Sequence, residues 1–285
     1  MAVTAIKLHR LFGAEIRGVD LTKPLDDPTF GAVLDAFNEY SVLLFRGQKL
    51  TDDQQVAFSR RFGPLETTVK SNPARGTHFA RQSNIDIATG RLIPPDDRQM
   101  ALQKPNLMWH SDSSFKPVPA LCSLLSARRV PPEGGETELV STRAAYAALP
   151  AEMKRRIDGL VAVHSYAYSR SQVDPDLLTE EEKAEVPPVE QALVRTNPVN
   201  GRKSLLIGSH ASHIVGWPVE DGRALLKELL EFATRARFRY RHRWRVNDLV
   251  IWDNRCTLHR ARSYDSRKYR RLMQRTTVVG TAATV

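Results

Sequence analysis

Two short runs of this chain carry residue types that bind metal ions. His110 and Asp112 stand two positions apart in the run Trp-His-Ser-Asp-Ser-Ser-Phe at 109–115, and His259 ends the run Trp-Asp-Asn-Arg-Cys-Thr-Leu-His at 252–259. In a strand, residues i and i+2 point to the same side, so His110 and Asp112 can converge on one ion. With a second imidazole, this ligand set suits non-haem Fe(II), which keeps open positions for a bidentate co-substrate and dioxygen. The same residues could bind zinc and activate water.

A pair of arginines follows the second histidine. If residues 270–278 form a strand, Arg271 and Arg275 share one face with Met273 between them. A guanidinium binds a carboxylate through a planar fork, so a dicarboxylate that chelates the metal could satisfy both arginines. The alternative is that both side chains lie outside and pair with surface acids.

Four ordered motifs together resemble the taurine/2,4-dichlorophenoxyacetate dioxygenase family, and most closely its 2,4-dichlorophenoxyacetate branch. They are the two metal-ligand runs, Val-Pro-Pro-Glu-Gly-Gly-Glu-Thr-Glu at 130–138, and Arg-Arg-Leu-Met-Gln-Arg-Thr-Thr at 270–277. The similarity begins at Leu11 and covers nearly the whole chain.

The resemblance implies a fold that is mainly β with flanking helices, a double-stranded β-helix or jelly roll. It also implies an Fe(II) centre that uses 2-oxoglutarate and O2. By motif, the iron ligands are His110, Asp112 and His259. The residues expected around 2-oxoglutarate are Thr137 and Arg271 at its distal carboxylate, Arg275 near its C1 end, and Asn106 and Trp244 lining the pocket.

The implied reaction couples oxidative decarboxylation of 2-oxoglutarate to hydroxylation of a small organic anion. An aryloxyalkanoate such as 2,4-dichlorophenoxyacetate is the first expectation, and taurine or another sulfonate is the rival. Candidate substrate residues are Lys70, Asn197, His210 and His213. Asn197 stands where the branch usually has a histidine, and His210 and His213 could also suggest a second metal site. Two alternatives of other classes are a zinc hydrolase and a non-enzymatic basic jelly-roll binding module.

Several common enzyme signatures are absent. The sequence has no G-x-x-x-x-G-K-S/T, no G-x-G-x-x-G after a strand, no G-x-S-x-G and no H-E-x-x-H. These absences disfavour a nucleotide triphosphatase, a dinucleotide enzyme, an α/β-hydrolase and a zincin.

The elements that must position these residues can be predicted in outline. We expect helices at 28–40, from the capping box at Thr51 to Phe62, at 142–158 and at 219–234. Strands are expected at 42–45, 159–168, 192–196, 203–208, 235–246, 249–253 and 270–278. No repeat or flexible linker divides residues 1–285, so we expect one domain. Residues 86–106 lack a pattern and are expected to form a lid loop.

Arginine occupies every odd position from 235 to 245, and most of the even positions are apolar or aromatic. Period two predicts a strand with a solvated arginine face and a buried inner face that includes Trp244. Nucleic-acid binding is disfavoured, because stacking proteins need arginines and aromatics on one surface. Asn247 and Asp248 then predict a tight hairpin turn into 249–253.

Composition sets the remaining limits. The 285 residues carry 42 lysines and arginines against 32 acids, a net charge of +10 that favours anionic partners. Two cysteines exclude a disulfide framework and indicate a reducing compartment. No apolar run is long enough for a membrane span or a signal peptide. We therefore expect a cytoplasmic protein without membrane or nucleic-acid partners, and a homo-oligomer as among its relatives.

Overall fold

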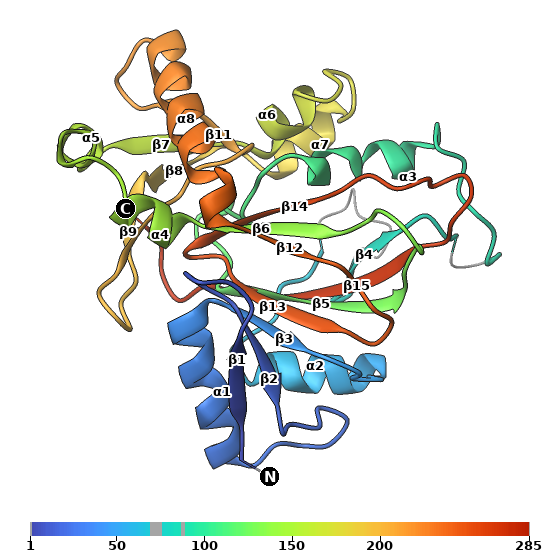
Figure 1. The fold of residues 1–285 in the computed structure, drawn as a ribbon. Helices are drawn as coiled ribbons and strands as arrows, with labels where there is room; N and C mark the ends of the chain where they lie inside the picture. Colours follow the sequence, from blue (N-terminus) through green and yellow to red (C-terminus); the bar gives the residue numbers. More distant parts are fainter. Residues whose placement is uncertain (1, 69–75, 87–88, 285) are drawn as a thin grey trace.

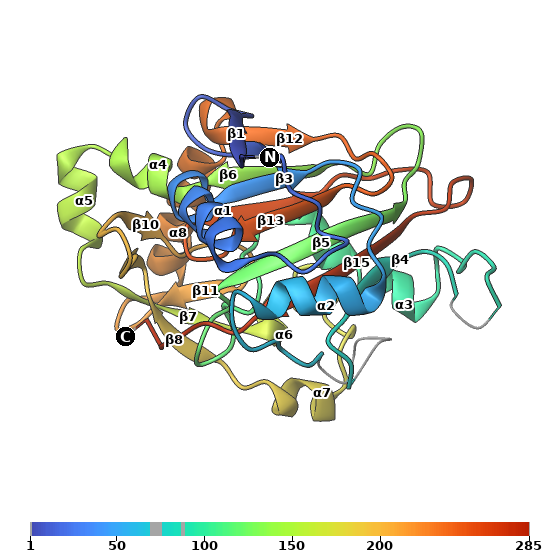
Figure 2. The same ribbon diagram turned by 90° about the horizontal axis from the view of Figure 1, so that it is seen from below.

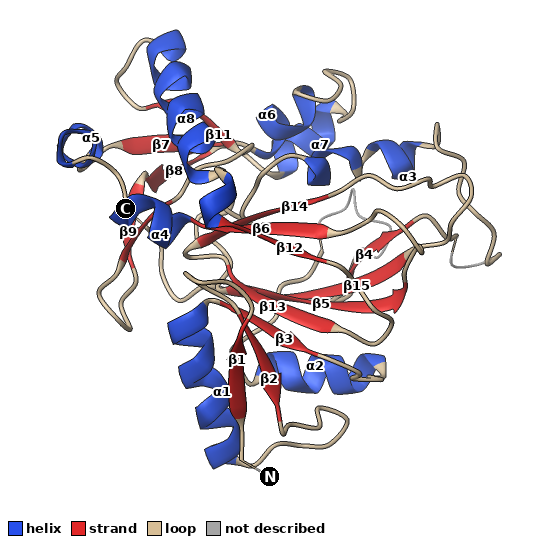
Figure 3. Ribbon diagram, viewed as in Figure 1, coloured by secondary structure: helices blue, strands red, loops and turns tan. Residues whose placement is uncertain are grey.

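Two facing β-sheets form the centre of the molecule, and helices cover them from outside (Figures 1 and 3). The computed structural model describes residues 2–68, 76–86 and 89–284. The larger sheet has seven strands, in the order β1 (Thr4–Lys7), β2 (Ala14–Arg17), β3 (Val42–Phe45), β13 (Leu249–Asp253), β5 (Cys122–Arg129), β15 (Leu272–Val278) and β4 (Ala80–Ser83). The fold is mainly β with flanking helices, as predicted.

The smaller sheet consists of β12 (Arg239–His242), β6 (Thr137–Ser141) and β14 (Thr257–Ala261), with β6 in the middle. In Figure 1 it lies above β13, β5 and β15. Leu139 of β6 packs between the sheets against Val250 and Trp252 of β13 and Met273 of β15. Around Leu139, the space between the two sheets is therefore filled by apolar side chains.

The outer face of the larger sheet is covered by α1 (Asp27–Tyr40) and α2 (Asp52–Arg60), seen from below in Figure 2. Phe30, Val33 and Phe37 of α1 belong to the same buried cluster as Leu43 and Phe45 of β3. This cover explains why β3 and β13 are apolar at nearly every position rather than at every second one. The helix predicted at 28–40 begins one residue earlier, after the Asp26 cap, and α2 begins at the predicted Thr51 capping box.

A second region lies around α8 (Val219–Ala233), which packs on β11 (Ala211–Ile214). Gly222 is required at this contact, because a Cβ there would lie 2.7 Å from the Ile214 amide nitrogen. The other elements of this region are α4 (Thr142–Ala147), α5 (Ala151–Ile157), β7 (Val161–His164), β8 (Val189–Ala192), β9 (Val194–Thr196) and β10 (Lys203–Leu205). The remaining helices are α3 (Arg98–Ala101), η1 (Lys104–Leu107), α6 (Tyr166–Ser171), α7 (Glu180–Glu185) and η2 (Ala236–Phe238).

Several predicted elements are shorter than expected. The strands predicted at 192–196, 203–208 and 270–278 are reduced to Val194–Thr196, Lys203–Leu205 and Leu272–Val278. The helix predicted at 142–158 is two helices, because Pro150 interrupts the backbone ladder and starts α5. The strand predicted at 159–168 ends at His164, because the Ser165 hydroxyl accepts a hydrogen bond from the Tyr168 amide and caps α6. Within 86–106, α3 and η1 give the expected loop local structure of its own.

The continuous strand predicted at 235–246 is wrong. Residues 236–238 form a 3₁₀ turn after α8, where Arg235 and Arg237 stack on Phe232. Only 239–242 form a strand, and its arginines form ion pairs with an acidic side chain in addition to contacting solvent. Arg241 lies 2.7 Å from the buried Glu138 of β6, which Arg260 of β14 also contacts at 2.7 Å.

The predicted hairpin at Asn247 and Asp248 is also wrong, although Asn247 does adopt the left-handed conformation of a turn, with φ 69°. β12 pairs with β6, whereas β13 pairs with β3 and β5, so the turn crosses from one sheet to the other. The Asp248 carboxylate fixes this crossing, since it accepts hydrogen bonds from Arg46 and from the Arg245 amide.

No helix in the described ranges combines the length and apolarity that crossing a bilayer requires. Cys122 and Cys256 are both buried and unbridged, in agreement with the absence of a disulfide framework.

Candidate metal centre and co-substrate pocket

His110, Asp112 and His259 come together at the edge of the smaller sheet. Their ligand atoms lie within 4.8 Å of one another, and all three residues are buried. Two backbone hydrogen bonds bring these residues together. The His110 amide donates to the His259 carbonyl at 3.0 Å, and the His259 amide donates to the His110 carbonyl at 2.9 Å. One antiparallel bridge thus joins the two sequence motifs and sets the two rings 4.2 Å apart.

Both imidazoles are prepared to act as neutral ligands. The His110 Nδ1 lies 2.8 Å from the Met108 carbonyl oxygen, which orients the ring. Burial lowers the pKa of His110 and holds that of His259 well below its ordinary value, where the neighbouring His110 adds to the effect. Neither ring nitrogen of His259 has a hydrogen-bond partner, although both are buried. Buried nitrogens without partners are costly, and a metal ion at this point would satisfy one of the two.

Asp112 supplies the negative charge of the site. Burial alone would raise the pKa of this carboxyl, but Arg275, His259 and His110 together hold it well below its usual range. Arg275 donates a short hydrogen bond to the Asp112 Oδ1, and Ser123 of β5 donates to the Oδ2 at 2.7 Å. The carboxylate is therefore ionised and fixed in direction, as a ligand for a divalent cation must be.

Asn254 organises the carboxylate side of the centre, and its role was not predicted from the sequence. Its Oδ1 accepts from the Asp112 amide at 3.2 Å and from the Trp252 indole at 3.1 Å. Its Nδ2 donates to the Ser123 hydroxyl at 3.1 Å, which is the group that holds the Asp112 Oδ2. The available signal was its place inside the 252–259 motif, between the strand and the metal-ligating histidine.

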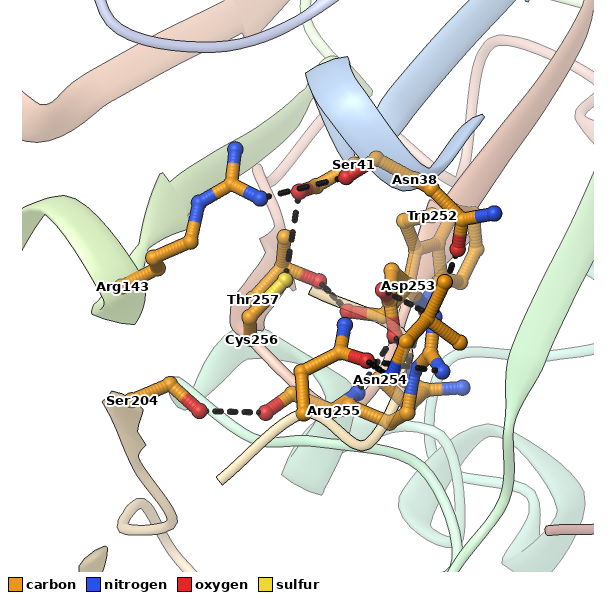
Figure 4. A network of polar contacts seen from close by, with 12 residues as sticks. Asn38, Ser41, Arg143, Ser204, Trp252, Asp253, Asn254, Arg255, Cys256 and Thr257 are labelled. Carbon is orange, nitrogen blue, oxygen red and sulfur yellow. Dashed lines mark hydrogen bonds and ion pairs between the residues drawn. The ribbon is translucent and has the colours of Figure 1, made fainter. Parts of the chain in front are cut away.

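The turn that carries Asn254 is braced by a second network, drawn in Figure 4. Arg255 donates to both carboxylate oxygens of Asp253, at 2.8 and 2.9 Å. The Thr257 hydroxyl donates to the Asp253 carbonyl, and the Ser204 hydroxyl donates to the Arg255 carbonyl. The residues between the two ends of the motif are thus structural, and they fix the distance from β13 to His259.

A cavity opens beside the triad, and five of the predicted site residues line it. His110, Asp112 and Arg275 line it, together with Asn106 and His210. The rings of His210 and His110 lie 6.2 Å apart. His213, by contrast, bonds Ser212 at 2.9 Å and does not line this cavity. Within the described residues the triad is the only group of three that could hold a metal ion, so a second metal site at His210 and His213 finds no support.

Arg271 lies in an adjoining cavity that shares Gln82 and Asn106 with the first. Arg275 lines the first cavity and Arg271 the second, so the prediction that both arginines contact one dicarboxylate stays a prediction. Arg271 precedes β15, and the pairing of β15 with β5 shifts register between Leu272 and Met273. Burial lowers the pKa of the Arg271 guanidinium to about 10, and its Nε has no partner, so it is a cation that needs an anion.

Thr137 and Trp244 meet as a pair on the smaller sheet. The Trp244 indole donates to the Thr137 hydroxyl at 3.0 Å, and Trp244 packs against the core between the sheets. The inward direction predicted for Trp244 is confirmed, although the residue lies in the loop after β12.

The remaining predicted substrate residues lie elsewhere. Asn197 is buried, but its Oδ1 accepts from Arg255 at 3.3 Å and from the Val199 amide, so it shapes a turn away from the triad. Lys70 lies outside the described residues.

Comparisons with known proteins agree with this geometry. The profile of the family described as "Taurine catabolism dioxygenase TauD, TfdA family" matches residues 4–277. The chain is 46% identical over 283 residues to the alpha-ketoglutarate-dependent 2,4-dichlorophenoxyacetate dioxygenase of Cupriavidus pinatubonensis, with 98% of each chain covered. It is 37% identical to the (S)-phenoxypropionate/alpha-ketoglutarate-dioxygenase of Sphingobium herbicidovorans, with 97% of this chain and 94% of the relative covered.

The solved structure of AAD-2 in complex with Mn(II) and N-oxalylglycine superimposes with a TM-score of 0.93 at 44% identity, covering 100% of this chain and 99% of the other. The match to the family extends over nearly the full length, and the matched range spans His110, Asp112 and His259. The chain therefore belongs to the TauD/TfdA family of dioxygenases.

Proposed function

We propose that this protein is an Fe(II)- and 2-oxoglutarate-dependent dioxygenase that hydroxylates an aryloxyalkanoic acid, such as 2,4-dichlorophenoxyacetic acid, at the carbon beside the ether oxygen. The reaction consumes O2 and 2-oxoglutarate and releases succinate and CO2. One oxygen atom enters the substrate, and the resulting hemiacetal collapses to a phenol and an oxo acid. The observation that carries the proposal is the buried triad of His110, Asp112 and His259, with both ring nitrogens of His259 unpartnered.

The chain's own residues supply binding and orientation. His110, Asp112 and His259 would hold the iron, which when bound supplies the oxidative chemistry with 2-oxoglutarate and O2. Arg271 would bind the distal carboxylate of 2-oxoglutarate beside Thr137, because it is a buried cation with a free Nε. Arg275 keeps Asp112 ionised and would lie near the other end of the co-substrate.

The finer features of the fold belong to the same proposal. We expect the two facing sheets to form a double-stranded β-helix in one domain spanning 1–285, with 86–106 acting as a lid over the cavity that Gln99, Gln103 and Asn106 line. A homo-oligomer in the cytoplasm remains a prediction, which sedimentation of the purified protein and cell fractionation would test.

A sulfonate such as taurine is the second candidate substrate, since a guanidinium binds carboxylate and sulfonate alike. The family match favours a dioxygenase over the zinc hydrolase and the non-enzymatic binding module.

Anaerobic addition of Fe(II) and 2-oxoglutarate tests the reaction class. Chelation should give a weak visible charge-transfer band, and exposure to air with substrate should then release succinate. Aryloxyacetates, aryloxypropionates and taurine are compared as substrates by succinate release. The His110→Ala variant should bind no iron and give no band. Well-metallated wild-type protein without the band would contradict the proposal. If taurine were the one compound tested that supports succinate release, the proposed aryloxyalkanoate substrate would be replaced by taurine.

A further inference from the structure

One arginine on the wall of the catalytic cavity has no role in the scheme above. Arg170 of α6 lines the same cavity as His110, Asp112 and Arg275. Among the described residues, no acidic side chain lies within salt-bridge distance of it. An anion bound to Arg170 would therefore lie in the same cavity as His110 and Asp112.

The guanidinium of Arg170 is held in place without being neutralised. It stacks 4.0 Å from the centre of the Tyr166 ring, and its Nη1 donates to the Ser169 hydroxyl at 2.8 Å. Its Nε is buried and has no hydrogen-bond partner. The Ser165 cap fixes the short helix that carries all three residues. A cation that is pre-oriented in this way keeps its binding capacity for a ligand.

Two other cations on the cavity wall, Lys116 and Arg275, are already paired with acids. Lys116 lies 2.6 Å from Glu66, and Arg275 is paired with Asp112. Burial, reinforced by Arg170, holds the pKa of His210 well below its ordinary value, so this imidazole is neutral. The wall formed by α6 and His210 therefore offers one positive charge, which an anion entering the cavity would neutralise.

The same wall also carries aromatic rings, against which the ring of an aromatic acid could pack. The Phe115 ring lies 4.8 Å from Tyr166 and 4.8 Å from His210, and all three rings line the cavity beside Arg170. In an aryloxyacetate the carbon to be hydroxylated bears the carboxylate directly. A carboxylate anchored next to the metal ligands would thus bring that carbon to the reacting centre.

We propose that Arg170 is the residue that binds the carboxylate of the substrate, with the Phe115, Tyr166 and His210 rings as its surround. This inference rests on the proposed function and assigns the anionic end of the substrate to a site on α6. It selects for organic acids over their uncharged analogues.

Arg81 of β4 is the rival, because it lines the same cavity and its Nε is also buried without a partner. Arg170, however, stacks on Tyr166, which in turn contacts Phe115, whereas Arg81 makes no such aromatic contact among the described residues. Arg81→Met is therefore a matched control, which removes one cavity arginine of the same type.

The experiment compares 2,4-dichlorophenoxyacetate with its uncharged amide as substrates of the wild-type enzyme, Arg170→Met, Arg170→Lys and Arg81→Met. Phenol release gives KM and kcat, and the anaerobic 2-oxoglutarate band gives co-substrate affinity and reports that each variant is folded and metallated. For Arg170→Met we expect KM for the acid to rise about 30-fold or more, because a buried charge pair is lost. KM for the amide and the affinity for 2-oxoglutarate should stay unchanged, and Arg170→Lys should recover part of the acid preference.

The outcomes separate the two proposals. Wild-type enzyme that releases no phenol from any aryloxy acid overturns the proposed function, and this inference with it. If the wild type turns over the acid and Arg170→Met still prefers the acid over the amide as strongly as the wild type does, the inference alone is overturned. Loss of that preference in Arg81→Met and not in Arg170→Met also overturns it. If Arg170→Met loses the 2-oxoglutarate band, the comparison passes to Arg170→Lys, for which an unchanged KM counts against the inference.

Discussion

Replacing Asn254 by alanine removes three side-chain hydrogen bonds that hold the carboxylate side of the metal centre. The partners are the Asp112 amide, the Trp252 indole and the Ser123 hydroxyl, all of which are buried. The backbone bonds of residue 254, to Leu121 and to the Ser111 hydroxyl, do not depend on its side chain. The turn should therefore persist while the support of Asp112 is lost.

The magnitude follows from the number of bonds. At about 0.5–1.5 kcal/mol each, three hydrogen bonds predict a loss of about 2–4 kcal/mol in the free energy of unfolding of the metal-free protein. Loss of the groups that orient a metal ligand costs about 10–100-fold in metal affinity. Ser123→Ala should give part of the same loss, and the double variant should lose less than the sum, because both residues act on one carboxylate.

Urea unfolding and calorimetric titration with Mn(II) measure the two effects separately. Asn197→Ala is the matched control, since Asn197 is an equally buried asparagine whose side chain bonds Arg255 and Val199 rather than the metal centre. It should lower stability and leave Mn(II) affinity intact. Unchanged Mn(II) affinity in Asn254→Ala, or an equal loss of affinity in both variants, would refute the assignment of Asn254 as a positioning residue.

Three further perturbations test other parts of the structure. Arg271→Met should raise the 2-oxoglutarate concentration needed for half-maximal succinate release by about 30-fold or more, because a buried charge-assisted contact is lost; an unchanged requirement would move the anchor elsewhere. Burial lowers the pKa of His164 to about 4, so below pH 6.5 the unfolded chain takes up more protons than the folded one. The metal-free protein should therefore lose up to about 3 kcal/mol of stability from this group between pH 6.5 and 4, and urea unfolding of His164→Gln should give a shallower pH dependence. Glu138→Gln should cost about 1–3 kcal/mol in thermal or urea unfolding, discounted because its partners Arg241 and Arg260 are partly exposed, and an unaltered midpoint would show that hydration replaces the pairs.

The residues of the candidate metal centre could be predicted because their chemistry is local in the sequence. His110 and Asp112 are two residues apart, and the partner histidine lies at the end of a second distinctive run. The same is true of α1 and α2, whose caps depend on neighbouring side chains. Asn254 and Arg170 were missed because their roles depend on what the fold brings to them from other segments, namely Ser123 and the open cavity.

The arginine pattern at 235–245 shows why periodicity alone can mislead. A period of two is compatible with a strand, but Arg235 and Arg237 lie just after α8, where stacking on Phe232 replaces strand pairing. At 239–242 the pattern does describe a strand. Its arginines are directed by Glu138 of the neighbouring strand, a partner that the local sequence does not reveal.

The position of β13 has a consequence for how the chain acquires its structure. This strand inserts between β3 and β5, which are made much earlier during synthesis, and its neighbour β14 brings His259 to His110. Until residues 249–253 leave the ribosome, β3 and β5 each present an unpaired edge, and such edges are templates for aggregation.

The large sequence separation of these pairings also predicts slow folding, because loop-closure entropy is lost before the contacts form. The metal centre can assemble only after β13 and β14 have been made, since His259 lies in β14. Metal loading would thus mark a chain whose synthesis has passed β14, and a chain that ends before β14 would carry His110 and Asp112 without His259.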